Sequence, residues 1–189
     1  MSASAFFTGL LALCGQAFEG RMVTDDPADT AMGAQRLVMH VRECDDETIR
    51  IPFHVGSDRS RTWVITRTAD GLRLKHDHRH EDGSSDVLTM YGGDTAAPGT
   101  AARQDFPADA ESIALFHREG RSVSITNTWT IEHHAGRLFA YALSRPPVGD
   151  AAPRRFRVEF DLGKPIEAPP APWGAEPKAA ESKAEAGGR

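Results

Sequence analysis

The chain has 189 residues, and 40% of them are hydrophobic, which suits a single domain with a hydrophobic core. Its formal net charge is −5, and because lysine and arginine are scattered instead of clustered, the composition argues against a nucleic-acid-binding protein. No apolar run approaches the roughly 18 residues that a membrane-spanning helix needs, so no membrane span is expected.

The first apolar stretch, residues 6–13, has two interpretations: it is part of a signal peptide, or it is the start of the folded domain. No basic residue precedes it, and Thr8 and Gly9 interrupt it. We therefore interpret residues 1–14 as a short N-terminal helix, and the chain as written would be cytoplasmic. If the protein is periplasmic or secreted, its signal peptide lies upstream of Met1.

Cys14 and Cys44 are the only cysteines of the chain. They permit one disulfide, which would close a loop of about 30 residues and stabilise the fold by roughly 3–4 kcal/mol in an oxidising compartment. The alternative is two buried free thiols in a cytosolic protein. The chain has no CxxC motif and no Cys/His spacing typical of a structural zinc site.

Between residues 15 and 162 the hydrophobic pattern has a period of two, which is typical of half-buried β-strands. We expect strands at residues 16–23, 37–42, 49–55, 63–67, 72–80, 87–91, 99–106, 123–131, 138–143 and 156–162. Each strand has one apolar face and short turns separate the strands, which indicates a largely antiparallel sheet.

One helix interrupts the strands between Pro107 and Gly120. Proline suits a first helical turn, Asp109 and Glu111 suit the N-terminal end of the helix dipole, and glycine suits the end of a helix. Many strands, one or two short helices and no βαβ unit predict an all-β fold, an antiparallel up-and-down β-barrel of about nine or ten strands. A barrel of this size is either filled with side chains or holds one small ligand.

The composition changes after Pro165, where a Pro/Ala-rich stretch that contains Trp173 leads into an Ala/Glu/Lys-rich run. Such a segment cannot bury enough apolar surface to fold. We therefore predict a β-barrel domain at residues 15–162 and a disordered Pro/Ala/Glu/Lys-rich tail at residues 163–189.

Several stretches of the chain carry a resemblance to known proteins. They are residues 14–20 (CGQAFEG), 49–56 (IRIPFHVG), 60–63 (SRTW), 75–83 (KHDHRHEDG) and 91–93 (YGG). With them, most of residues 6–162 resembles a group of uncharacterised bacterial proteins, usually exported, and the chain as a whole is similar to calycin-type, lipocalin-like barrels. The resemblance implies that barrel fold and an exported protein, and it implies no particular activity.

The stretch from Leu72 to Gly83 is the most informative part of the chain. It alternates for ten residues and stops at Asp-Gly, a strong signal for a hairpin turn. One face carries Leu72, Leu74, His76, His78 and His80, and the other carries Arg73, Lys75, Asp77, Arg79 and Glu81. We expect the charged face in solvent and the other face on the inner barrel wall, running from a hydrophobic core to a mouth.

Two expected two-residue turns, Asp70-Gly71 and Asp82-Gly83, set the neighbours of this strand. They place His76 opposite Ile65 and Thr89, and His78 opposite Trp63 and Val87. The register predicts one contiguous inner patch that binds a ligand. Its members are Trp63, Ile65, His76, His78, Val87, Thr89 and Tyr91.

Three hypotheses explain the histidines of this patch. In the first they bind a metal ion, since His-x-His on a strand places His76 and His78 about 7 Å apart at Cα, and a third ligand would come from elsewhere. In the second they hydrogen-bond to Thr89, Tyr91, Ser85 or ordered water at the mouth of a filled barrel. In the third they offer polar contacts to an organic ligand that stacks near Trp63.

The change from apolar residues to histidines along one face favours a function in binding. We expect a small-molecule-binding, lipocalin-like protein that holds an apolar or aromatic ligand in a barrel lined by histidine and tryptophan. The alternative is an enzyme, metal-assisted or not, that uses the same histidines, although no catalytic motif stands out. The metal ion is the one cofactor considered and is not preferred, and the sequence leaves the ligand's identity and the oligomeric state open.

Overall fold

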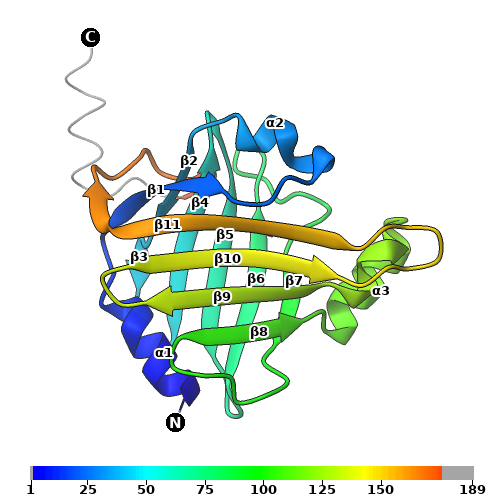
Figure 1. The fold of residues 1–189 in the computed structure, drawn as a ribbon, viewed down its shortest axis with the longest axis horizontal. Helices are drawn as coiled ribbons and strands as arrows, with labels where there is room; N and C mark the ends of the chain where they lie inside the picture. The colour runs from blue at the N-terminus through cyan, green and yellow to red at the C-terminus, as the bar shows by residue number, and fades with distance from the viewer. Residues whose placement is uncertain (1, 176–189) are drawn as a thin grey trace.

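The computed structural model of the protein describes residues 2–175. Within these residues the chain forms eleven strands, three α-helices and two 3-10 helices (Figure 1). The strands are β1 (Ala17–Met22), β2 (Leu37–His40), β3 (Glu43–Cys44), β4 (Thr48–Val55), β5 (Asp58–Arg67), β6 (Leu72–His78), β7 (Tyr91–Asp94), β8 (Arg103–Pro107), β9 (Thr128–His134), β10 (Leu138–Arg145) and β11 (Arg154–Ile166). The helices are α1 (Ser2–Leu11), η1 (Pro27–Asp29), α2 (Thr30–Gly33), α3 (Ala110–Arg118) and η2 (Ser122–Thr126). In this part of the chain no helix is long and apolar enough to cross a membrane.

The strands form one antiparallel sheet that curls into a nearly closed barrel. Ten of them pair in the order β7-β6-β5-β4-β2-β1-β11-β10-β9-β8, and β3 adds to β4. Most partners are also neighbours in the sequence, because short connections join adjacent antiparallel strands. β1 and β11, which are far apart in the chain, pair with each other and join the two halves of the barrel. The predicted all-β, up-and-down barrel is confirmed.

The barrel is not closed by a hydrogen-bonded ladder between β7 and β8 in the described chain; the start of α3 lies there instead. The Asp109 backbone N–H donates to the carbonyl of Gly92 at 2.9 Å. Ser112 Oγ accepts from the Gly92 N–H at 2.8 Å and donates to its carbonyl at 2.9 Å. A side chain at Gly93 would place its Cβ 1.8 Å from the Pro107 carbonyl oxygen. Glycine at this position therefore lets β7 approach β8 closely.

One end of the barrel, the closed end, is filled by α1. Phe6, Phe7 and Leu10 of this helix have no exposed surface, and the Arg67 guanidinium lies 4.1 Å from the centre of the Phe7 ring. A helix was predicted at residues 1–14, and α1 covers Ser2–Leu11 of this range. Burying three large apolar side chains seals this end and stabilises the fold.

A disulfide ties the segment after α1 to the sheet. Cys14 and Cys44 are bonded, with an S–S distance of 2.07 Å and a sequence separation of 30. Of the two alternatives for these cysteines, the disulfide is the one found. It holds the helical plug to the strand pair β3–β4.

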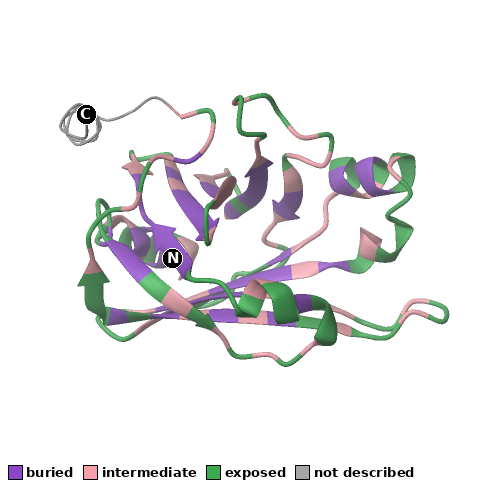
Figure 2. Ribbon diagram, turned by 90° about the horizontal axis from the view of Figure 1, so that it is seen from above, coloured by how far each residue is buried: buried purple, intermediate pink, exposed green. Residues whose placement is uncertain are grey.

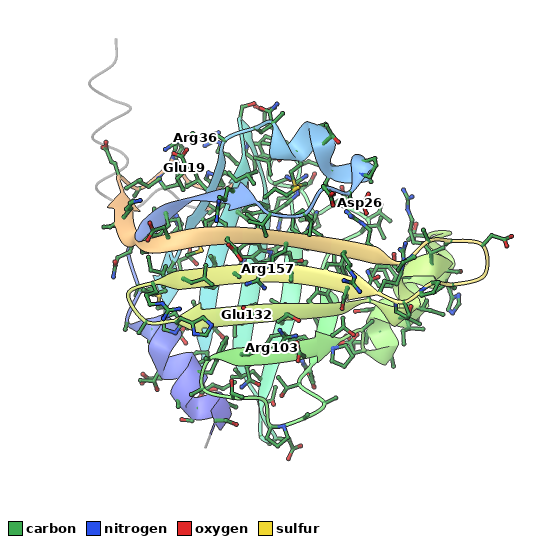
Figure 3. All side chains as sticks on the ribbon, in the orientation of Figure 1. Glu19, Asp26, Arg36, Arg103, Glu132 and Arg157 are labelled. Carbon is green, nitrogen blue, oxygen red and sulfur yellow. A yellow bond between two sulfur atoms is a disulfide. The ribbon has the colours of Figure 1, made fainter. Side chains whose placement is uncertain are left out.

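The strands of the barrel form two layers with the core between them. Figure 2 shows one layer of strands along the lower part of the view and a second layer above it, with buried residues in both layers. In β6, Leu72 and Leu74 are buried and Arg73 between them is exposed, as the period of two requires. On β8, β9 and β11, the ion pairs of Arg103 with Glu132 and of Glu132 with Arg157 form a row across the outer face (Figure 3).

The predicted neighbours of the histidine strand are wrong by two residues. His76 lies opposite Trp63 and Tyr91, instead of Ile65 and Thr89. The loop between β5 and β6 has four residues, 68–71, closed by a bond from the Thr68 N–H to the Gly71 carbonyl at 3.0 Å. A shift of two residues keeps every side chain on its predicted face.

The turn predicted at Asp82-Gly83 also differs from the two-residue turn expected there. The strand predicted at residues 87–91 is wrong. The carboxylate of Asp82 accepts from the backbone N–H of Ser84 at 2.9 Å, and the His80 N–H donates to the Ser84 carbonyl. This local turn ends the strand early, since an aspartate side chain competes for backbone donors. The strand that pairs with β6 begins only at Tyr91, and Val87 lies in the loop before it.

The strand predicted at residues 123–131 is correct only in its second half. Residues 122–126 form η2, with a bond from the Ser124 N–H to the Arg121 carbonyl at 2.8 Å. β9 then begins at Thr128. Val123, which would have faced the core in a strand, is exposed.

The charged face of β6 is not in solvent throughout, contrary to the prediction. Lys75 and Asp77 are 7% and 4% exposed. Lys75 Nζ lies 2.6 Å from a carboxylate oxygen of Asp109 at the start of α3. Asp77 lies between Arg50 and Arg79, at 2.7 and 2.9 Å. The alternation gave the facing of these residues, but it contains no information about the segments that cover the outer face.

The segment after residue 162 is ordered as far as residue 175. β11 continues to Ile166, and the chain then crosses the outer face of the barrel. There the backbone N–H of Trp173 donates to the Arg59 carbonyl, and Arg59 Nη1 donates to the Ala171 carbonyl. The prediction of disorder from residue 163 is therefore wrong for residues 163–175, because these contacts to Arg59 hold the proline-rich chain on the sheet. Residues 176–189 of the predicted tail lie outside the described residues.

Candidate functional site

The end of the barrel opposite α1, the open end, carries the histidines of β6. Burial changes along this strand as the sequence predicts: Leu72, Leu74 and His76 are buried, His78 is half-buried and His80 is exposed. The loop between β1 and β2, which contains η1 and α2, lies at the same end (Figure 1).

A cavity of about 150 Å³ opens at this end, and we call it the first cavity. Aromatic side chains from strands on both sides of the barrel dominate its lining, with two arginines among them. The lining residues are Asp29, Met32, Phe53, Arg61, Thr62, Trp63, His76, His78, Tyr91, Tyr141, Leu143, Arg154 and Phe156.

Trp63 forms the floor of the first cavity in a stack of three rings. Its ring centroid lies 4.9 Å from that of Phe53 and 4.4 Å from that of Tyr141, with interplanar angles of 15° and 19°. Only 2% of Trp63 is exposed. Such stacking holds the indole in one orientation, and the cavity lies beside the stacked rings.

His76 fixes the orientation of Tyr141 at the same place. His76 Nδ1 lies 3.0 Å from the carbonyl oxygen of Tyr91, and Nε2 lies 2.7 Å from the Tyr141 hydroxyl. A carbonyl only accepts, so Nδ1 carries the proton and Nε2 accepts from Tyr141. Burial lowers the pKa of His76 to about 3 and raises that of the Tyr141 hydroxyl. Both groups are therefore neutral near pH 7.

His78 and Tyr91 form a second pair nearer to solvent. The Tyr91 hydroxyl lies 3.1 Å from His78 Nε2. Burial lowers the pKa of His78, and the positive charge of Arg61 lowers it further. Burial also raises the pKa of Tyr91 to about 12. The histidines and tyrosines thus form an uncharged wall that offers hydrogen bonds.

The charged side chains that line the first cavity are Arg61, Arg154 and Asp29. Arg61 Nη1 lies 2.6 Å from Asp58. Arg154 Nη2 lies 2.5 Å from Asp29, and Arg154 Nη1 lies 2.8 Å from Asp26 (Asp26 is labelled in Figure 3). The two ion pairs of Arg154 hold η1 over one side of the cavity, and α2 follows η1 directly.

The described residues offer no ligand set for the metal alternative. Both ring nitrogens of His76 are already hydrogen-bonded, and in residues 2–175 no group of three or more His, Cys, Asp or Glu side chains is arranged to hold a metal ion. His76 and His78 instead form hydrogen bonds with the hydroxyl groups of Tyr141 and Tyr91.

The structure brings four of the seven predicted site residues to the first cavity, namely Trp63, His76, His78 and Tyr91. Ile65 is fully buried in the hydrophobic core, deeper in the barrel. Thr89 accepts a hydrogen bond from the backbone N–H of His78 at 2.9 Å and does not line the cavity. Val87 is 66% exposed, so its predicted place on the inner wall is wrong.

The residues that β10 and β11 contribute to the cavity were not predicted from the sequence. Tyr141 and Leu143 alternate with Ala142 on β10, and Phe156 is on β11. The period of two in the predicted strand 138–143 already placed Tyr141 and Leu143 on one face. The sequence pattern does not show how the barrel closes, and it is this closure that brings the face with Tyr141 and Leu143 opposite β6.

A larger hollow of about 620 Å³ lies outside the barrel, between residues 172–175 and the outer face of β4–β6. Its charged groups already satisfy one another: Arg42 pairs with Glu43, and Asp77 pairs with Arg50 and Arg79. The first cavity is the better candidate for a functional site, because small-molecule sites are mainly apolar with a few convergent polar groups.

A comparison of the chain with protein-family models, curated proteins and solved structures found no match. The geometry of the open end is therefore the basis for the function proposed below.

Proposed function

We propose that this protein binds a small planar aromatic molecule in the first cavity, with the ring of the ligand against Trp63 and Tyr141. The observation that carries this proposal is the rigid stack of Phe53, Trp63 and Tyr141 beside an open space. Aromatic rings pack against one another in offset-stacked or edge-to-face arrangements, so a planar ligand ring can pack against the rings that line this space.

The size of the cavity supports a ligand with one ring. Its volume is about 150 Å³, and an engineered apolar cavity of about 150 Å³ in another protein binds benzene. A single six-membered ring therefore fits, and a larger ring system needs additional space.

The charges at the cavity favour a neutral or anionic ligand. Aromatic faces attract cations. The lining of this cavity has two guanidinium groups, Arg61 and Arg154, and one carboxylate, Asp29, and the other partners of the arginines lie outside the lining. The positive groups at the cavity wall therefore oppose a cationic ligand. The hydroxyl of Tyr141 is committed as a donor to His76, and its oxygen keeps the capacity to accept. Arg61 offers further N–H donors. A ring that bears a carboxylate or a hydroxyl group matches this lining.

We also propose that the protein is a calycin-type, lipocalin-like barrel that works outside the cytoplasm. The disulfide between Cys14 and Cys44 supports an oxidising compartment. The single antiparallel sheet, the helical plug at one end and the cavity at the other support the comparison with that class of barrel.

Titration of tryptophan fluorescence tests the proposed binding. Benzoate and phenol should change the emission of Trp63 with saturation, and benzylamine, which is cationic near pH 7, should bind more weakly. Trp63→Phe should remove the change, whereas Trp173→Phe, outside the barrel, should preserve it. If none of the three compounds changes the emission of the folded wild-type protein, the proposal is wrong.

A further inference from the structure

A second cavity adjoins the first at the open end of the barrel. It has a volume of about 330 Å³. Leu88, Phe116 and Trp129 contribute apolar surface to its lining, and Arg121 and Asn127 contribute polar groups. Its lining is thus apolar with a few polar groups, as expected for part of a small-molecule site.

The two cavities share four lining residues, which form a thin partition between them: His78, Tyr91, Tyr141 and Leu143. Tyr91 is central to it. Its ring stacks on His76, with centroids 4.7 Å apart, and also packs against Phe116 and Trp129 at 5.5 and 5.6 Å.

Few contacts hold the polar edge of this partition. The Tyr91 hydroxyl meets His78 Nε2 at 3.1 Å, and His78 is only half-buried. Met90, directly before Tyr91, has a φ of 55°, the one positive φ among the non-glycine residues of the described chain. That left-handed conformation is costly for a residue with a side chain, so the turn that directs Tyr91 inward is strained.

A residue that lines the second cavity has a buried acceptor that no described residue satisfies. Asn127 is 6% exposed, and its Oδ1 has no hydrogen-bond partner within residues 2–175. A buried carbonyl oxygen without a donor costs free energy. Asn127 lines the cavity, so a turn of its side chain toward this space would let an O–H or N–H group of a ligand supply that donor.

From these observations we infer that the two cavities form one two-part site for an elongated ligand. One aromatic ring with an anionic or polar group occupies the first cavity beside Trp63 and Arg61. A second ring with a hydroxyl or amine donor occupies the second cavity beside Trp129 and Asn127. The ligand is thus a two-ring aromatic compound with a donor on its distal ring. This inference rests on the proposed function and names the class of ligand for that site.

Each cavity contains one tryptophan, and this permits a direct test. In a Trp173→Phe background, Trp129→Phe leaves Trp63 as the single reporter of the first cavity, and Trp63→Phe leaves Trp129 as the single reporter of the second. The probes are benzoate, biphenyl-4-carboxylate and 4′-hydroxybiphenyl-4-carboxylate. Circular dichroism establishes that each variant is folded before titration.

Benzoate should change the emission of Trp63 and not that of Trp129. Both biphenyl compounds should change both, and they should bind at least about tenfold more tightly than benzoate, because the second ring buries additional apolar area. The hydroxylated compound should bind more tightly than the other, and Asn127→Ala should remove this preference.

The outcomes separate the two proposals. If every probe changes Trp63 alone, the site has one part and this inference is overturned, whereas the proposed function stands. If both biphenyl compounds bind equally well to the unsubstituted Asn127 protein, the assigned donor is wrong. If neither tryptophan responds to any probe, the proposed function fails together with the inference.

Discussion

The two ends of this barrel are built from the same strands and differ in what fills them. At the closed end, Phe6, Phe7 and Leu10 fill the space and have no exposed surface. At the open end, His76 and Tyr141 form a neutral, hydrogen-bonded wall beside a cavity. β6 runs through both regions, from Leu72 to His78.

This difference suggests that one end of the barrel stabilises the fold and that the other end binds a ligand. Apolar burial at the closed end contributes stability, because each large side chain removed from water contributes about 1.5–3 kcal/mol. The open end leaves space unfilled and keeps buried polar groups, which costs stability. A substitution at the closed end should therefore affect folding, and one at the open end should affect binding first.

The largest effect is expected for Phe7→Ala at the closed end. Removing a fully buried phenylalanine ring leaves a cavity and should lower the free energy of unfolding by about 3–5 kcal/mol. Chemical denaturation monitored by circular dichroism measures this change. Under conditions where the variant is folded, benzoate should bind with unchanged affinity. A loss of affinity in the folded variant would mean that the two ends are not independent.

Opening the disulfide should have the next largest effect. Reduction of the Cys14–Cys44 bond, or the double substitution Cys14→Ser/Cys44→Ser, releases a loop of 30 residues and should cost about 3–4 kcal/mol. The melting temperature, measured by calorimetry with and without reductant, should fall by several degrees. An unchanged melting temperature would show that the bond adds no stability to the closed end.

Acid should destabilise the protein through His76 at the open end. Its pKa is lowered by burial to about 3 in the folded state, whereas an exposed histidine has a pKa of about 6.5. The unfolded chain therefore binds more protons between these values, and the stability that neutral His76 preserves near pH 7 is lost as the pH falls below about 6.5.

His76→Gln keeps a hydrogen-bonding side chain that cannot take up a proton in this range. Between about pH 7 and pH 5 the stability difference between wild type and this variant should shrink by about 2 kcal/mol. Urea unfolding at both pH values measures it. A difference that does not change with pH would show that His76 is not held neutral by burial.

A smaller effect is expected for Asp77→Ala on the outer face of β6. Burial alone would raise the pKa of Asp77, but hydrogen bonds from Arg79 and Arg50 lower it below the usual value. The carboxylate therefore contributes stability above about pH 4, and this contribution is lost as the pH falls further. The substitution should cost about 1–2 kcal/mol near pH 7, since both arginines are partly in solvent.

Arg73→Ala is the matched control on the same face of β6. Arg73 pairs with Asp94, and both side chains are 46% exposed, so its loss should cost at most about 1 kcal/mol. Equal effects of the two substitutions in urea unfolding would contradict the difference in burial between Asp77 and Arg73. Benzoate affinity should be unchanged in both variants.

Much of the fold could be predicted from the sequence, because the hydrophobic period of two is a local signal. It gave the antiparallel barrel, the inward facing of His76 and the gradient of burial along β6. The turns were harder to predict. The Asp82 carboxylate accepts a hydrogen bond from the backbone N–H of Ser84, so residues 82–83 do not form the predicted two-residue hairpin turn. The next strand therefore begins only at Tyr91.

The rest of the site depends on contacts between distant parts of the chain. Tyr141 meets His76 across 65 residues of sequence, and Arg154 reaches Asp29 across 125. Local patterns contain no information about which strands face each other after closure. The burial of Asp77 and the order of residues 163–175 were not predicted for the same reason, because both depend on contacts between distant parts of the chain.

A nuclear magnetic resonance titration tests the central claim most directly, because the indole N–H signals of Trp63, Trp129 and Trp173 report three different parts of the molecule. With ¹⁵N-labelled protein and biphenyl-4-carboxylate, the account predicts that the Trp63 and Trp129 signals shift together and saturate. The Trp173 signal and the backbone signals of Phe7 and Leu72 should stay in place. Shifts at Trp173 or at the closed end, with Trp63 unmoved, would contradict the assignment of the open end as the binding site.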